Sequence, residues 1–212
     1  MTTWLTALPT WGLIRFSGIA SYLLLFAGVV TGILGSLPQA KGPLKARLYR
    51  LHSNTLGIGF LLGLAHGMLL AVDAYMPYSW REVIVPFAAA QDPLWAGLGS
   101  LAFYGSLLIL LTTDFKALIG GKAWRMIHLL AYPVFAMTLL HGLGSGTDSS
   151  SVWMKGCYAV TGLAVVSLTA VRAAIGKGSA DGRPAAGGPR NSSSRTAQKP
   201  AVIEVEGFAV DR

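Results

Sequence analysis

The sequence has little charge and almost no cysteine. Of its 212 residues only 12% are Asp, Glu, Lys or Arg, whereas soluble domains carry roughly 25%. The charged residues fall in short clusters between long apolar runs, and these runs lack the polar stripe of a water-facing helix. The pattern disfavours a soluble bundle and indicates an integral membrane protein. A single cysteine, Cys157, excludes an internal disulfide and any zinc or iron–sulfur site built from cysteines.

Five apolar runs are long enough to span a membrane, which takes roughly 20 residues. They predict an all-α bundle of about five transmembrane helices. No basic segment precedes the first run, so we do not expect a cleavable signal peptide. The predicted spans cover residues 16–34, 52–72, 94–112, 126–143 and 152–171.

The composition changes abruptly at Gly176 to Gly, Ser, Pro, Arg and Ala. Such a segment cannot bury a core. We therefore divide the chain into a transmembrane domain, residues 1–175, and a disordered cytoplasmic tail, residues 176–212. The more hydrophobic stretch 201–210 is either a docking peptide or simply an unstructured end.

The basic residues are distributed unevenly between the two sides of the membrane. Fourteen of the 17 Lys and Arg fall in the loops after spans one and three and in the tail, against Arg15, Arg81 and Lys155 on the other side. Cytoplasmic loops carry the excess of Lys and Arg, so the N-terminus is predicted outside and the C-terminus in the cytoplasm. The net charge of +8 thus reflects sidedness in a plasma membrane, with lipid and not nucleic acid as the partner.

All four histidines lie in two of the predicted spans. His52 and His66 are 14 residues apart in the second span, and His128 and His141 are 13 apart in the fourth. At 1.5 Å per residue each separation is about 20 Å. Because both spans run from inside to outside, the histidines form an inner pair, His52 with His128, and an outer pair, His66 with His141.

Two imidazoles at one depth match the axial ligation of a b-type haem, and saturated ligation suits electron transfer. Zinc is a weaker candidate, because no intramembrane Asp, Glu or Cys completes either pair. The haem propionates need cationic partners. Arg47, Arg50 and Arg125 are available inside, and Arg15 lies outside at about the depth of His141.

Helix geometry tests this pairing. At 100° per residue, His52, Gly59, Gly63 and His66 share one face of the second span. These glycines admit either a flat macrocycle or a neighbouring helix. In the fourth span the 13-residue spacing puts His141 about 140° from His128, and Pro133 between them is expected to kink or rewind the helix. Whether that correction aligns the two faces is left open.

The chain resembles the ferric reductase-like transmembrane domain, the haem module of NADPH oxidases, ferric reductases and the membrane subunit of a bacterial methionine sulfoxide reductase system. The resemblance covers about residues 11–172. It rests on Arg15-Phe-Ser-Gly, Leu51-His52, Ala65-His66-Gly67, the run from Trp124 through His128 to Pro133, Leu140-His141-Gly142 and Gly146-Thr-Asp148.

The resemblance implies haem pairs His52–His128 and His66–His141, with Arg15 near the outer haem. It also implies electron flow from a cytoplasmic donor to an outer acceptor. Oxidases and reductases of the family carry cytoplasmic FAD and NAD(P)H domains after the last span. Here the residues after that span hold no Gly-rich nucleotide-binding fingerprint. A separate reductase, a quinol or a flavin bound at the inner face would then supply electrons.

These observations predict a transmembrane b-type cytochrome with two haems, either an oxidoreductase or an electron-transfer subunit. Two alternatives stay open. One is the quinol-oxidising cytochrome b subunit of a respiratory complex, which also uses four histidines in two helices. The other is a membrane scaffold or transporter without redox chemistry.

Overall fold

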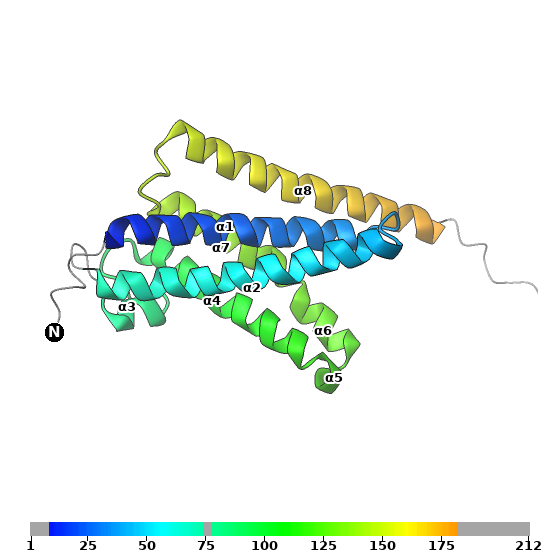
Figure 1. The fold of residues 1–212 in the computed structure, drawn as a ribbon, viewed down its shortest axis with the longest axis horizontal. Helices are drawn as coiled ribbons and strands as arrows, with labels where there is room; N and C mark the ends of the chain where they lie inside the picture. Colours follow the sequence, from blue (N-terminus) through cyan, green and yellow to red (C-terminus); the bar gives the residue numbers. More distant parts are fainter. Residues whose placement is uncertain (1–8, 74–77, 182–212) are drawn as a thin grey trace, which may run out of the picture.

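The computed structural model describes residues 9–73 and 78–181, and from residue 176 onward it describes the backbone alone. The described chain is entirely helical, as predicted, and contains no strand (Figure 1). Its elements are α1 (Thr10–Gly35), α2 (Gly42–Val72), α3 (Trp80–Ile84), α4 (Pro93–Asp114), α5 (Lys116–Ile119), α6 (Gly121–His128), α7 (Ala131–Ser145) and α8 (Val152–Asp181).

Five helices are long and apolar enough to cross a membrane, which confirms the predicted number of spans. They cover Thr10–Gly35, Gly42–Val72, Pro93–Asp114, Gly121–Ser145 and Val152–Ile175. Each extends beyond the run read from the sequence, because helices continue past the hydrocarbon boundary into polar residues. Helix α8 runs to Asp181, six residues beyond the start predicted for the tail. The rest of that predicted tail, residues 182–212, lies outside the described residues.

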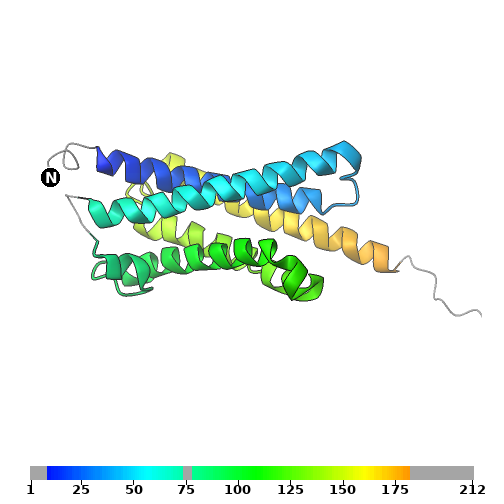
Figure 2. The same cartoon turned by 60° about the horizontal axis from the view of Figure 1, so that its bottom comes forward.

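The spanning helices form two antiparallel pairs and a fifth helix. Helix α1 packs along α2, and α4 packs along α7, while α8 contacts both α1 and α7. In contrast, α2 touches α4 only sparsely, and at most a weak contact joins α2 to α7 in the described chain. Figure 2 shows α1 and α2 side by side above α4. The two pairs therefore face each other across a layer that backbone packing does not close.

The contact between α1 and α2 depends on small residues of both helices. Ser21 Oγ of α1 donates a hydrogen bond to Gly59 O of α2 at 2.8 Å. A Cβ added to Gly59 would lie 3.2 Å from Leu24 Cβ, and one added to Gly63 would lie 3.1 Å from Ser21 Oγ. These two glycines thus form a helix-packing seam, which answers the question that the sequence left open.

Aromatic side chains join α8 to the rest of the bundle. The ring of Tyr22 on α1 lies 5.1 Å from that of Tyr158 on α8 in an edge-to-face arrangement and 5.9 Å from that of Phe135 on α7. The Tyr22 hydroxyl also hydrogen-bonds Thr161 of α8. Paired hydroxyls of this kind satisfy polar groups that hydrocarbon would leave unsatisfied.

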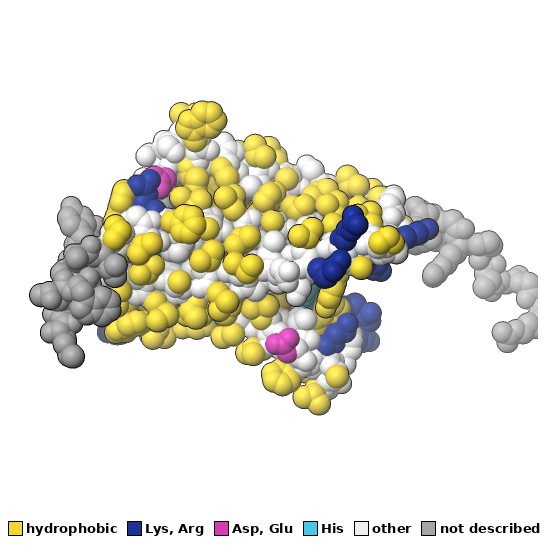
Figure 3. Space-filling model, viewed as in Figure 1, with side chains coloured by type: hydrophobic (Ala, Val, Ile, Leu, Met, Phe, Trp, Pro, Cys, Tyr) yellow, Lys and Arg dark blue, Asp and Glu magenta, His cyan; other side chains and the backbone are white. Residues whose placement is uncertain are grey.

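The surface is apolar along the spans and charged at one end. Large hydrophobic side chains are exposed on every span, among them Phe16, Leu61 and Val160 at 67%, 62% and 66%. In Figure 3 most Lys and Arg atoms gather at the right-hand end, around the α1–α2 connection and helices α5 and α6. An apolar belt with a basic end is the surface of a multi-pass membrane protein.

The fourth span is broken. Helix α6 ends at His128, and α7 begins at Ala131. The break lies just before Pro133, which has no N–H to donate to the carbonyl four residues earlier. The intervening turn is tightened, since Leu130 N donates to Ile127 O at 2.9 Å and Tyr132 N to Leu129 O at 3.2 Å. The rewinding expected at Pro133 is therefore present.

Helix α3 forms a small cap on the connection between α2 and α4. Ser79 and Glu82 form a capping box at its start, and Glu82 Oε1 also accepts from Ala90 N at 2.9 Å. These hydrogen bonds to its charged form lower the pKa of Glu82 to about 2. Ser100 and Tyr104 of α4 donate to the carbonyls of Val83 and Ile84, which ties the cap to the bundle.

Candidate functional site

The four histidines meet in two pairs across the layer between the helix pairs. The ring centroids of His52 and His128 are 6.1 Å apart, and those of His66 and His141 are 6.3 Å apart. The interplanar angles are 61° and 79°. The inner and outer pairs are thus those predicted from depth. The break before Pro133 brings His128 and His141 to the same side of their span despite the 13-residue spacing.

Both histidines of α2 use one ring nitrogen to bind α1. His52 Nδ1 lies 2.7 Å from Gly28 O, and His66 Nδ1 lies 2.9 Å from Ile14 O. Each carbonyl can only accept, so Nδ1 carries the proton. The proton then is absent from Nε2 in the neutral ring, which leaves that nitrogen's lone pair for a metal.

Glycines on α1 give these imidazoles room. A Cβ added to Gly32 would lie 2.9 Å from His52 Nδ1, and one added to Gly18 would lie 3.0 Å from His66 Nδ1. Each glycine follows its accepting carbonyl residue by four positions, and Gly18 and Gly32 are 14 residues apart, as are the two histidines. The antiparallel register therefore repeats one glycine–carbonyl notch at both depths.

Helix α4 provides the same notch for His141. The Nδ1 of His141 lies 2.8 Å from Trp95 O, and a Cβ on Gly99 would lie 2.8 Å from that Nδ1. Gly99 again follows the carbonyl residue by four positions. Three of the four rings are therefore oriented by a hydrogen bond to a neighbouring helix.

His128 is held differently from the other three. Its Nδ1 is buried, and it finds no hydrogen-bond partner in the described chain. Instead its ring stacks on Trp124, one helical turn earlier, at 4.9 Å between centroids and 29° between planes. The inner pair thus combines one histidine bonded to a carbonyl with one stacked on an indole.

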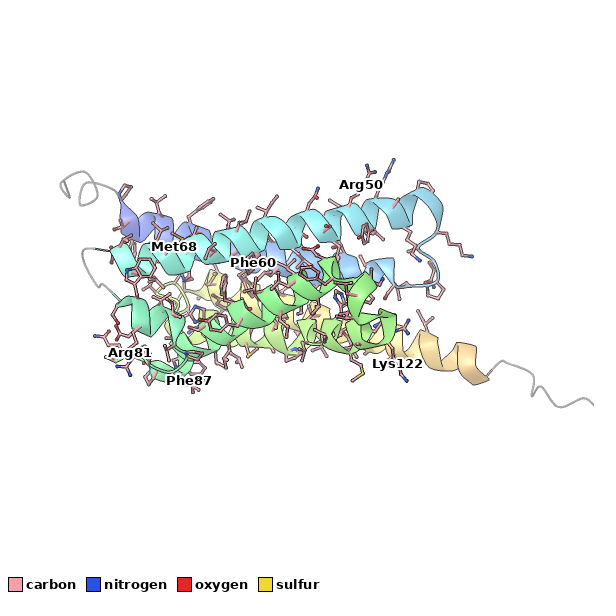
Figure 4. The ribbon with its side chains drawn as sticks, turned by 90° about the horizontal axis from the view of Figure 1, so that it is seen from below. Arg50, Phe60, Met68, Arg81, Phe87 and Lys122 are labelled. Carbon is pink, nitrogen blue, oxygen red and sulfur yellow. The ribbon has the colours of Figure 1, made fainter. Side chains whose placement is uncertain are left out.

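Of the arginines proposed for propionates, Arg15 has an acidic partner. Its Nε and Nη2 donate to the two carboxylate oxygens of Asp148, in the α7–α8 connection, and its guanidinium lies 4.2 Å from the centre of the Trp11 ring. This bidentate pair joins the outer ends of α1 and α7. Arg50 and Arg125 are exposed, and Figure 4 shows Arg50 projecting from α2 away from the other helices. Propionate binding by Arg15, Arg50 and Arg125 stays a prediction.

An aromatic pair lies between the two histidine pairs. Phe60 of α2 stacks on Phe103 of α4, with 4.8 Å between centroids and 13° between planes (Figure 4). Phe60 lies eight residues after His52 and six before His66. This stack bridges α2 and α4 at mid-depth and separates the inner pair from the outer pair.

The donor set decides which metal group fits. Two metal–nitrogen bonds of about 2.0 Å, extended by the radii of two imidazole rings, span about 6 Å between centroids. The observed 6.1 and 6.3 Å match that span. No cluster of three or more His, Cys, Asp or Glu exists among the described residues, so neither pair completes the shell of a bare ion. Haem supplies four equatorial nitrogens itself and needs only two axial ligands, so these residues fit haem.

Sequence reasoning found the histidines and missed the groups that orient them. Gly18, Gly32 and Gly99 were not singled out, although the 14-residue spacing of the first two repeats that of His52 and His66. The stacking of Trp124 on His128 was also missed. The four-residue spacing of an aromatic and a histidine on one helix was the available signal.

Comparison with protein-family models, with curated proteins and with solved structures finds no match to this chain. The functional argument therefore depends on the geometry of the four histidines.

Proposed function

We propose that this chain is a transmembrane b-type cytochrome that holds two haems, one between His52 and His128 and one between His66 and His141. When bound, these groups supply one-electron transfer. The function is ferric reductase-like transfer from a cytoplasmic-side donor to an outer acceptor. The observation that carries the proposal is the pairing of four intramembrane imidazoles at centroid distances of 6.1 and 6.3 Å.

The surroundings of the histidines support a ligand role over a packing role. A packing histidine needs no particular free nitrogen, whereas an axial ligand needs Nε2 unprotonated and aimed across the site. Backbone carbonyls hold Nδ1 of His52, His66 and His141, and this leaves Nε2 of each ring available. Intramembrane ionisable groups are costly and are retained for function.

The positions of the pairs support transfer across the membrane. Along α2 the two histidines are about 21 Å apart at 1.5 Å per residue, which is most of the roughly 30 Å hydrocarbon core. The inner pair lies beside the basic end of the bundle, where Lys116, Lys122 and Arg125 are exposed. A reductase, a flavin or a quinol delivers electrons there in this proposal.

An optical redox titration of the purified protein tests the proposal. We expect a reducible b-type spectrum with two resolved transitions in protein from haem-replete cells. His66→Ala should remove the outer transition, and His52→Ala the inner one. Asn54→Ala is the matched control, since Asn54 is an exposed polar residue of α2 two positions from His52. Protein that binds no haem, or histidine variants that keep both transitions, would contradict the proposal.

The donor is identified in the same preparation. Haem reduction is followed with a flavin reductase and NAD(P)H in one arm and with a quinol in the other. Reduction in the first arm alone supports the ferric reductase-like assignment. Reduction in the quinol arm alone instead supports the cytochrome b subunit of a respiratory complex.

A further inference from the structure

The inner ligand His128 lacks the carbonyl notch that the other three histidines have. His141 lies 13 residues after His128, and the same step along the antiparallel helix α4 leads from Trp95 to Leu108 and from Gly99 to Thr112. Thr112 is β-branched where the other notches have glycine. Its Oγ1 donates to Leu108 O at 2.7 Å. The corresponding carbonyl is therefore already bonded, and a side chain fills the corresponding gap.

Trp124 takes the place of that notch. Its indole stacks on the His128 ring at 4.9 Å. The indole is itself held from two directions, because Nε1 donates to Thr113 Oγ1 at 3.2 Å and Lys116 Nζ lies 4.0 Å from the ring centre. Hydrogen bonding and cation–π attraction both favour one orientation of the indole. The stacked face of His128 is thereby fixed without any hydrogen bond to Nδ1.

We infer that Trp124 is a positioning residue for the inner haem ligand, and that it makes the inner haem the more readily reduced of the two. This inference rests on the proposed function. A hydrogen bond from Nδ1–H makes a histidine a stronger donor to its metal, and stronger donation stabilises the oxidised iron. Both outer ligands have this bond, whereas the inner pair has it only at His52.

Local charge acts in the same direction. Lys116 stands over Trp124, and Arg125 follows it directly in α6. Positive charge near a redox centre favours its reduced form. At the outer pair, the Arg15 guanidinium is matched by Asp148. Ligand donation and charge therefore both raise the potential of the inner haem above that of the outer one.

The test is a redox titration of the full-length, haem-loaded protein, with the inner transition assigned by His52→Ala. In the wild type the inner transition should have the higher midpoint. Trp124→Leu should shift and broaden the inner transition, and should change the low-temperature EPR signal of the inner haem alone, because His128 is then free to rotate. Trp124→Phe keeps a stacking ring and should shift it less. Trp153→Leu is the control, because Trp153 is 91% exposed.

The outcomes separate this inference from the proposed function. A wild type with two haems whose inner transition is unmoved in Trp124→Leu overturns the role of Trp124 and leaves the proposed function intact. An equal shift of both transitions also overturns it, and an inner midpoint below the outer one overturns the potential order. A wild type without haem overturns both proposals. If Trp124→Leu does not fold, Thr113→Val decides, since it removes only the indole hydrogen bond and should shift the inner transition in the same direction by a smaller amount.

Discussion

Replacing Gly99 by alanine should selectively weaken haem binding at the outer pair. The added Cβ would lie 2.8 Å from His141 Nδ1 and Cε1 and 3.1 Å from Cγ, where ordinary contact begins at 3.4 Å. The ring must therefore retreat by about 0.6 Å, the difference between 3.4 and 2.8 Å. That movement stretches the 2.8 Å bond from Nδ1 to Trp95 O beyond the usual 2.7–3.2 Å range.

The cost falls on the ligand and not on the fold. Losing one hydrogen bond costs about 1 kcal/mol, and losing the partner that orients a metal-bound histidine typically lowers metal affinity about 10- to 100-fold. Alanine in a helix interior gains up to about 1 kcal/mol over glycine. We therefore expect haem-free Gly99→Ala to be about as stable as the wild type, while its outer haem dissociates at least about tenfold faster.

The assay measures haem loss to an excess of apomyoglobin together with the redox titration. Gly57→Ala is the control, because no atom lies within 4 Å of its added Cβ on α2. It gains the same helix propensity without touching a histidine. If Gly99→Ala retains both haems with wild-type kinetics and potentials, the glycine notch does not constrain His141 and the reasoning is wrong.

Three further predictions follow from the same contacts. Gly32→Ala should affect only the inner haem and Gly18→Ala only the outer one, which a redox titration of each variant would show; a reversed pattern would contradict the register of α1 and α2. Asp148→Asn should lower the melting temperature in detergent by the equivalent of about 1 kcal/mol, the value of a partly exposed ion pair, and an unchanged melting temperature would argue against that contribution. The stability that Glu82 contributes to α3 should be complete above its ordinary pKa of 4.5 and be lost as the pH falls from 4.5 to about 2; amide exchange of α3 should show this loss in the wild type and not in Glu82→Gln.

The number of spans and the depth of each histidine were determined by the sequence itself. A membrane span requires a long apolar run, so composition along the chain is sufficient to locate it. Depth follows from the rise per residue and from the direction of each span, and this was enough to place His52 with His128 and His66 with His141. Both deductions depend on distances along a single helix axis, which local residues fix.

The orientation of each imidazole was decided only by tertiary structure. Helix periodicity put His128 and His141 about 140° apart, and the break between α6 and α7 removed that offset, because the residues freed by Pro133 rewind against α4. The glycines of α2 also shared a face with its histidines, yet they pack on α1. The notches at Gly18, Gly32 and Gly99 come from another helix in each case. Their positions depend on the register between two helices, which packing of the whole bundle sets and no single segment encodes.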